Sequence, residues 1–298
     1  MVSKLDLYKV FCMVGKSKSF SKAAKSLYMT QPAVSQSIMQ LESELDTRLF
    51  NRTPKGVTLT NEGSLLFDYV HSALKLIEAG EDKILEFKNL TTGELIIGVG
   101  DTISRHFLLP YLEAFHNSYP NIKFKLANGT TFEICSLLKT GEVDIGICNF
   151  PLEDPKLELL PCIDIHDIFV CGKKSRDQIS NPLSLDDVAR LPLILLEPRS
   201  NSRKYVEEYM LSRGIKVSPE FELGSHELLL DFAKINLGIA CVIKEFAEEE
   251  LKKGLLYEVP LVEAIPKRSI GVCYLKSVPL SPAATKFVEI IERSKKKV

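Results

Sequence analysis

Uncharged hydrogen-bonding side chains recur on one face of a helix that the sequence predicts near the N-terminus. Gln can form a two-point hydrogen bond with adenine, and Ser can bond to a base edge or a phosphate. A helix that meets only water would more often carry Lys and Glu there. The pattern therefore indicates that this face contacts double-stranded DNA, and it carries Gln31, Ser35, Gln36, Met39 and Gln40.

A second set of polar residues follows several predicted strands in the C-terminal two thirds of the chain. Ligands of open α/β sheets bind beyond the carboxyl ends of the strands. Two of these segments, 102–104 and 200–202, directly precede predicted helices, whose first N–H groups attract anions. Each single Ser or Thr could be an ordinary helix cap, and only the convergence favours a site. The candidates are Thr102, Ile103, Gly129, Thr130, Asn149, Phe150, Ser200, Asn201, Ser202, Arg203, Ser225 and His226.

The predicted ligand of this second set is a small anion: a carboxylate, a sulfate or a phosphate. Arg203, together with Ser200, is the expected clamp, because a guanidinium binds carboxylates and phosphates with paired hydrogen bonds. No cofactor or metal ligand set is predicted, since the Cys residues are scattered without a CxxC pair. Most of them lie in apolar contexts that favour reduced, buried thiols.

Three short helices must position the N-terminal polar face. An apolar stripe predicts a first helix up to about Lys16, and residues 19–21 offer N-cap hydroxyls for a second. Thr30 caps the third, and Pro32 sits in its first turn, where its missing N–H is harmless. The arrangement predicts a helix-turn-helix, although a small helical bundle with no DNA role would show the same periodicity. The residues expected to face inward from the third helix are Ala33, Val34, Ile38, Leu41 and Leu45.

Residues 49–60 are typical of a strand, a Pro–Lys–Gly turn and a second strand, which together make a wing. Arg52 and Lys55 at its tip are placed to meet phosphates or the minor groove. They could instead be solvated turn charges, and for Lys55 alone the two interpretations are equally favoured. The candidate DNA-binding residues are Ser21, Thr30, Gln31, Pro32, Ser35, Gln36, Arg52 and Lys55.

A long helix is predicted from Thr60, its cap, to about Asn89, followed by a break at 90–93. Leu66, Tyr69 and Leu76 belong to an exposed apolar stripe that needs a partner helix. From Glu94 onward strands and helices alternate, which implies parallel α/β sheets. We expect one lobe from about 91–162 and 267–298 and another from about 163–266.

These residues resemble the LysR family of transcriptional regulators over nearly the whole chain. One departure is Asp46, where the family often has Gly; Asp tolerates a left-handed backbone. Residues 198–203 resemble loops of subfamilies that sense small anions, although Asn201 and Ser202 stand where such loops often carry Gly and Thr. The resemblance is carried by the residues around Phe20–Leu27, Thr30–Ser35, Leu49–Arg52, Leu59–Gly63, Leu108–Pro110, Gly141–Ile147 and Gly238–Ala240.

The resemblance implies an α+β multidomain protein. It would contain a winged helix-turn-helix (1–60), a linker helix that dimerises (61–90), and a two-lobed effector-binding domain related to periplasmic binding proteins (91–298). It implies a homodimer, often assembled into a homotetramer, with RNA polymerase as a further partner. Ligand binding would close the lobes around 161–164 and 265–268, and so move the DNA-binding heads.

Charge and composition agree with this interpretation. Residues 1–60 carry nine Lys and Arg against four Asp and Glu, a net +5, whereas the remainder carries a net −6. A basic head on an acidic body is typical of a polyanion-binding protein. No apolar run approaches the roughly 18 residues of a membrane span, and the N-terminus lacks the apolar core of a signal peptide. The cytoplasm is therefore the expected location.

Two other classes compete with a regulator. An enzyme with a regulatory head would be expected to show a catalytic motif, but GxSxG, P-loop and HExxH patterns are absent from the sequence. A ligand-binding transport component would be expected to carry a signal peptide and no basic head. Both alternatives are therefore disfavoured.

Overall fold

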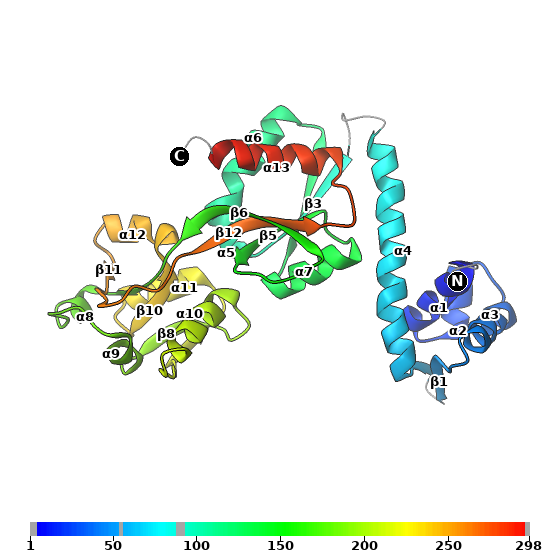
Figure 1. Cartoon of the computed structure of the whole chain (residues 1–298), viewed down its shortest axis with the longest axis horizontal. Coiled ribbons are helices and arrows are strands. Elements are labelled where there is room, and N and C mark those ends of the chain that lie inside the picture. The colour runs from blue at the N-terminus through cyan, green and yellow to red at the C-terminus, as the bar shows by residue number, and fades with distance from the viewer. Residues whose placement is uncertain (1–4, 54–55, 88–92, 296–298) are drawn as a thin grey trace. The chain divides into compact units, whose positions relative to one another are not determined.

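The computed structural model describes residues 5–53, 56–87 and 93–295. The chain divides near Leu85 into two compact units, and each is described by itself. Figure 1 shows the helical N-terminal unit and the α/β C-terminal unit.

The first unit begins with three helices, and the sequence explains where each starts. The Ser19 hydroxyl accepts a hydrogen bond from the N–H of Lys22, and the Thr30 hydroxyl accepts one from the N–H of Ala33, each at 3.3 Å. Pro32 lies in the first turn of the third helix, as predicted. The helices are α1 (Leu5–Ser17), α2 (Phe20–Ser26) and α3 (Gln31–Glu44).

The core of this unit is formed by the inward faces of the three helices. Phe11, Val34 and Ile38 are almost completely buried, and the predicted apolar stripe is confirmed for them. The expectation for Leu45 was wrong, since its side chain is 40% exposed. Helix α3 ends at Glu44, and the next turn passes through Asp46 at φ 47°, so Leu45 no longer follows the helical stripe.

The predicted wing is a two-stranded antiparallel hairpin, β1 (Phe50–Thr53) and β2 (Gly56–Leu59). It is fixed to α3 by Glu42, whose carboxylate accepts hydrogen bonds from the N–H groups of Leu49 at 2.7 Å and Phe50 at 3.2 Å. The tip, including Lys55, lies outside the described residues, as does the side chain of Arg52.

Helix α4 (Asn61–Phe87) follows the wing. Its predicted cap is confirmed, because the Thr60 hydroxyl accepts from the N–H of Gly63 at 2.9 Å. Gly63 is required there, since a Cβ at this position would lie 2.1 Å from the carbonyl oxygen of Leu49.

The apolar residues of α4 divide into two faces. Leu66, Phe67, Val70 and Leu74 pack against the core of the helical head. The expectation that Leu66 belongs to an exposed stripe was therefore wrong, and Leu76 is half-buried. The sequence pattern places the apolar residues of this helix on one exposed surface, whereas some of them pack against the core of the head. The residues left exposed are Leu65 (64%), Tyr69 (68%) and Ile77 (43%).

The second unit contains two mixed sheets, and we call each sheet with its helices a lobe. In lobe I, β3 is parallel to β4 and β5, whereas β12 is antiparallel to β5 and β6. The order is β4-β3-β5-β12-β6. The strands are β3 (Gly93–Val99), β4 (Ile122–Asn128), β5 (Ile145–Phe150), β6 (Leu157–Ile165) and β12 (Arg268–Leu275). The helices are α5 (Asp101–Ile103), a π-helical turn (Ser104–Leu108), α6 (Leu109–Ser118), α7 (Thr131–Thr140) and α13 (Pro282–Lys295).

Lobe II has the order β11-β7-β10-β8-β9, with β8 parallel to β9 and β10, and β7 antiparallel to β10. The expected parallel pairing is present in both lobes, but β12 in lobe I and β7 in lobe II run antiparallel to their neighbours, so both sheets are mixed. The strands are β7 (Asp167–Cys171), β8 (Leu193–Leu196), β9 (Phe221–Leu223), β10 (Ile239–Ile243) and β11 (Tyr257–Glu258). The helices are α8 (Lys173–Arg176), α9 (Leu185–Ala189), α10 (Asn201–Leu211), α11 (His226–Lys234), a 3-10 turn (Lys244–Phe246) and α12 (Glu248–Lys252).

The chain passes between the lobes where β6 leads into β7 and where β12 begins. A buried ion pair marks this crossing: Nη2 of Arg268 lies 2.8 Å from Oδ1 of Asp167, and both side chains are at most 2% exposed. The crossing therefore joins the two sheets through a desolvated, directional contact. No helix among the described residues is long and apolar enough to cross a membrane.

Five of the seven cysteines are buried, and the described cysteines form no disulfide with one another. Cys148 and Cys273 lie 3.6 Å apart in lobe I. Hydrogen bonding with Cys135 and Cys273, together with burial, raises the pKa of the Cys148 thiol. Such thiols are weak nucleophiles, because the thiolate is the reactive form.

Candidate functional site

The polar face of α3 lies on the surface of the head. Gln31 and Gln36 are exposed and Ser35 is half-buried. Thr30 and Pro32 are exposed at the start of the same helix, and Ser21 is exposed at the start of α2. Except for the two wing residues, the predicted DNA-binding positions are thus brought together by the α2–α3 turn.

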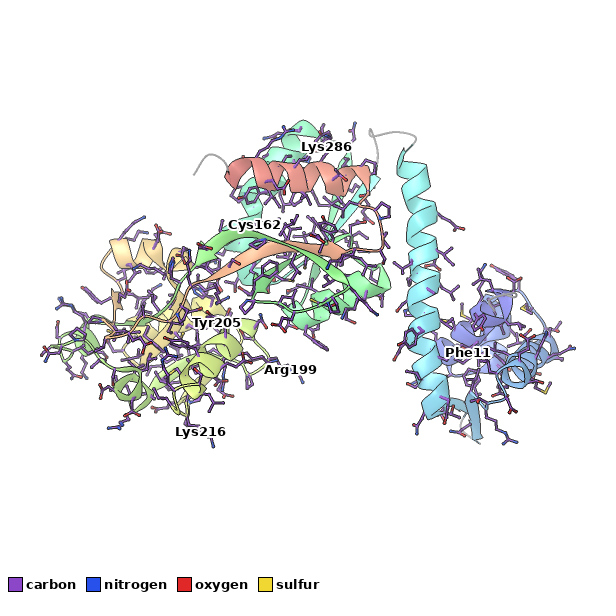
Figure 2. All side chains as sticks on the ribbon, viewed as in Figure 1. Phe11, Cys162, Arg199, Tyr205, Lys216 and Lys286 are labelled. Carbon is purple, nitrogen blue, oxygen red and sulfur yellow. The ribbon has the colours of Figure 1, made fainter. Side chains whose placement is uncertain are left out.

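Small residues behind this face let the two helices approach closely. Ala23 and Ala24 of α2 are buried against the same core as Val34 and Ile38 of α3. The polar face of α3 is therefore held outward by packing on its opposite side. The described side chains of the head are drawn in Figure 2, where Phe11 marks its core.

The turn between α2 and α3 carries two exposed apolar side chains that the sequence interpretation did not single out. Tyr28 is 99% exposed and Met29 is 37% exposed. Tyr28 adopts φ 54°, a left-handed backbone that turns its side chain out of the core. The sequence signal for these exposed side chains is Tyr28, which interrupts the apolar pattern between the two predicted helices.

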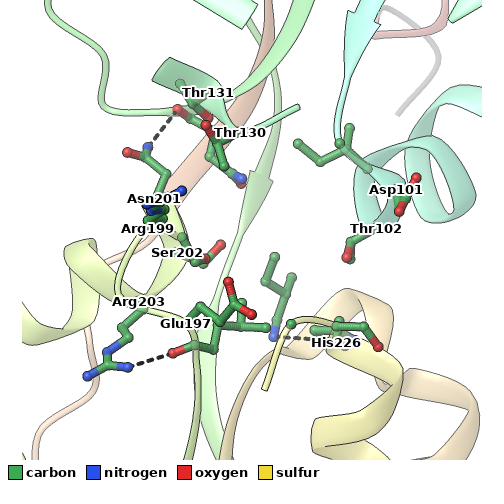
Figure 3. A pocket seen from close by; sticks show the side chains of 18 of the residues that line it. Asp101, Thr102, Thr130, Thr131, Glu197, Arg199, Asn201, Ser202, Arg203 and His226 are labelled. Atoms are coloured by element: carbon green, nitrogen blue, oxygen red, sulfur yellow. Dashed lines mark hydrogen bonds between the residues drawn. The ribbon is translucent and has the colours of Figure 1, made fainter. Parts of the chain in front are cut away.

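A cavity of about 380 Å³ lies in the second unit, between the two lobes. It is lined by the segments that follow the carboxyl ends of β3, β4, β8 and β9, as the ligand rule for α/β sheets predicts. Figure 3 shows several of these side chains around the open space. The predicted residues that line it are Thr102, Ile103, Gly129, Thr130, Asn149, Ser200, Asn201, Ser202, Arg203, Ser225 and His226.

Phe150 is the predicted residue that does not line the cavity. Its side chain is 6% exposed, and its ring packs over Gly271 of β12. Neighbouring residues of a strand point to opposite faces of the sheet. Because Asn149 lines the cavity, Phe150 points away from it.

Four helices begin at the cavity, and they are capped differently. Thr130 and Glu133 cap α7, since the Thr130 N–H donates to Oε2 of Glu133 at 2.8 Å. Ser225 caps α11 by accepting from the N–H of Leu228 at 3.3 Å. Thr130 and Ser225 therefore act as ordinary caps. Within the described residues, the N-cap of α10, Ser200, makes no side-chain cap bond, nor does Gly100 before the three-residue α5.

Arg203 does not hold the position predicted for an anion clamp. Its Nε lies 2.8 Å from Oε1 of Glu207, and its Nη1 lies 2.8 Å from both Oε1 of Glu222 and the carbonyl oxygen of Leu196. The side chain is only 8% exposed, and Figure 3 shows it pointing away from the open space. We therefore correct the prediction: Arg203 fastens α10 to its own lobe.

His226 is a buried wall residue, with 2% of its surface exposed. Burial, aided by the nearby His106, lowers the pKa of His226 to about 4, so its ring is neutral near pH 7. Nε2 accepts a hydrogen bond from the N–H of Ile243 at 3.2 Å. The ring proton must therefore sit on Nδ1, which has no hydrogen-bond partner among the described residues.

Asn149 connects the lobes behind the cavity. Its Oδ1 accepts from Nη1 of Arg268 at 2.7 Å, and its carbonyl oxygen accepts from Nδ2 of Asn201 at 3.2 Å. Asn201 is the first residue of α10. The start of α10 is thus joined to the crossing by a chain of hydrogen bonds.

The fold and the two sites define a class: a winged helix-turn-helix head with a two-lobed small-molecule-binding domain, as found in transcriptional regulators. The sequence model described as "Bacterial regulatory helix-turn-helix protein, lysR family" matches residues 5–64, and "LysR substrate binding domain" matches residues 88–295. The chain belongs to the LysR family of transcriptional regulators, and the resemblance seen in the sequence is confirmed.

Curated relatives are named as regulators, not enzymes. The "Probable RuBisCO transcriptional regulator" of Guillardia theta is 28% identical over 274 residues, which cover 90% of this chain and 88% of that protein. The "HTH-type transcriptional regulator CysL" of Bacillus subtilis (strain 168) is 25% identical over 288 residues, 91% of this chain and 96% of that protein.

Among solved structures, full-length CbnR complexed with its target DNA has a TM-score of 0.64 to this chain. It is 21% identical, and the match covers 98% of this chain and 99% of CbnR. This likeness supports the shared fold.

Proposed function

We propose that this protein is a sequence-specific transcription regulator whose DNA binding or activation is controlled by a small ligand that carries an anionic group. The ligand binds in the cavity between the lobes. One observation carries the proposal: the carboxyl ends of several strands and the start of α10 lie around the same cavity. The N-cap of α10, Ser200, makes no side-chain cap bond among the described residues. Helix N–H groups without a cap are natural partners of an anion.

The head supplies the DNA-binding half of the proposal. Gln31 and Gln36 present amide groups from the first two turns of α3, where a recognition helix meets base edges in the major groove. Ser21, Thr30 and Arg52 are proposed to contact the backbone or the minor groove, together with Lys55. CbnR, which shares this fold, has been solved with its target DNA.

Ligand binding is proposed to act by hinge motion at the two crossings between the lobes. Closure alters the relative placement of the heads in an oligomer. It shifts the equilibrium only if the ligand binds the two states with different affinity. The exposed face of α4, with Leu65, Tyr69 and Ile77, supports a homodimer. Assembly to a tetramer and contact with RNA polymerase are family expectations that we carry forward, as we do the cytoplasmic location expected from the sequence.

The first test is a gel-shift titration of the full chain on the DNA upstream of its own gene. It is run at two salt concentrations, with and without sulfate, phosphate and a series of small carboxylates. We expect tight, salt-sensitive binding that one of these anions modifies. Absence of sequence preference under every condition would contradict the regulator, and turnover of an anion would favour an enzyme instead.

A further inference from the structure

The charged side chains that line the cavity restrict which charges its ligand can carry. Five carboxylates line it, against two guanidinium groups. A ligand that is only an anion would meet more like charge than opposite charge. The carboxylates are Asp101, Glu133, Asp167, Glu197 and Glu227, and the guanidinium groups belong to Arg199 and Arg203.

Most of these charges already have partners. Arg203 is held by Glu207 and Glu222, and Asp167 is paired with Arg268. Hydrogen bonds from Thr130 lower the pKa of Glu133, and the charge of Arg199 acts in the same direction. Arg199 is exposed and forms no ion pair with a described residue, so one lining guanidinium group remains to offset the other carboxylates.

Two of the five carboxylates are exposed to solvent and have no ion-pair partner among the described residues. Glu227 lies 3.6 Å from Arg105 and from His106, whereas Asp101 and Glu197 form no ion pair with any described residue. In Figure 3 the side chain of Glu197 points into the open space between Ser202 on one side and Thr102 with Asp101 on the other. A cationic group bound there would sit beside Glu197.

Two further features of the cavity call for an acceptor on the ligand. Helix α10 offers the N–H groups of its first turn and the hydroxyls of Ser200 and Ser202. The Nδ1–H of His226 is a buried donor without a described partner, although a buried donor is normally satisfied. The cavity therefore combines donors for an anionic oxygen with a carboxylate for a cation.

We propose that the effector is a small zwitterion of the α-amino acid type, with its carboxylate at the start of α10 and its ammonium against Glu197. This inference rests on the proposed function and narrows it. A volume of about 380 Å³ suits a molecule of this size. The cavity discriminates between an amino acid and the same acid without its ammonium group. Without the ammonium, Glu197 lies beside the ligand's carboxylate, and like charges in a partly desolvated site repel.

The test is calorimetric titration of the full chain with the twenty α-amino acids and with the matched 2-hydroxy acids, such as lactate for alanine. We expect at least one amino acid to bind and its hydroxy counterpart to bind at least about tenfold more weakly. Glu197→Gln should weaken binding of that amino acid by a similar factor. Glu208→Gln, which removes an exposed carboxylate of α10 outside the cavity, should not.

Two results would overturn the zwitterion: no amino acid binds, or a hydroxy acid binds as tightly as its amino acid. In the second case the ligand is a plain anion, and the proposed function stands. If no acid of either series binds, and sulfate, phosphate and the small carboxylates also leave the gel shift unchanged, the anion-controlled function fails as well.

Discussion

The N–H of Ile243 on β10 donates to Nε2 of His226, at the start of α11, across 3.2 Å. This bond fixes the neutral tautomer of a ring that is 2% exposed. Protonation of the ring would break the bond, because Nε2 would then carry a hydrogen. The neutral imidazole is therefore part of the folded structure of lobe II.

Stability should fall in mild acid because of this residue. The pKa of His226 is about 4 in the folded protein, against 6.5 for the free group, so the unfolded chain binds a proton that the folded one does not. Below about pH 6.5 the free energy of unfolding decreases, by up to about 3 kcal/mol near pH 4, and the effect then levels off. Urea unfolding of the wild type and of His226→Gln across this range measures it. The variant should show a shallower slope, whereas His116→Gln, at an exposed site on α6, should keep the wild-type slope.

The two ion pairs at the lobe crossing should differ in energy. Arg268→Ala leaves Asp167 charged and buried, and we expect a loss of about 3–5 kcal/mol in the free energy of unfolding. Lys267→Ala removes the neighbouring pair with Asp164, whose side chains are 64% and 57% exposed, and should leave the free energy of unfolding almost unchanged, because solvent screens the pair. Denaturant unfolding measures both. Equal losses would mean that burial does not set the energy of the Arg268 pair.

Gln36 should contribute to sequence preference more than to general affinity for DNA. A two-point contact with a base contributes about 1–3 kcal/mol of discrimination, whereas non-specific binding depends on phosphates. Gln36→Ala should therefore weaken binding to the cognate site by about tenfold or more and leave binding to random DNA unchanged. Filter binding to both DNAs measures the ratio, with Gln178→Ala on the second unit as the matched control. An equal loss on both DNAs would exclude base readout by Gln36.

The exposed face of α4 should hold the dimer together. Tyr69→Lys and Ile77→Lys each place a charge on this face, and we expect monomers in sedimentation velocity. Ser64→Lys changes an exposed residue of the same helix off this face, and should leave the oligomer intact. An unchanged sedimentation coefficient in the two first variants would place the interface elsewhere.

The local signals in the sequence predicted much of this architecture. Thr30 and Thr60 were recognisable as caps because a hydroxyl stood directly before an apolar helical repeat, and both accept the expected N–H. Asp46 adopts the left-handed backbone expected of a residue that replaces Gly. The cavity-lining segments followed from a general rule about strand ends.

The features that the sequence did not predict depend on contacts between residues far apart in the chain. Arg203 could not be assigned correctly, since Glu222 comes close only after β9 pairs with β8. The local signal for a structural role of Arg203 is Glu207, which lies four residues further along the same helix and accepts from its Nε. The return of residues 269–275 to the first lobe was predicted, but the antiparallel direction of β12 against β5 and β6 was not, because a strand pattern does not show the direction of its neighbours.

The central claim is that a ligand in the cavity and DNA at the head are energetically coupled. The direct test is to measure the affinity of the full chain for its operator with and without the bound ligand, and the affinity for the ligand with and without operator. We predict that both affinities change by the same factor, as linkage requires, in the wild type. The Thr102→Ala, Ser202→Ala double variant should bind the operator normally and lose the response. A ligand that binds without changing operator affinity, or a folded double variant that no longer binds DNA, would contradict the account.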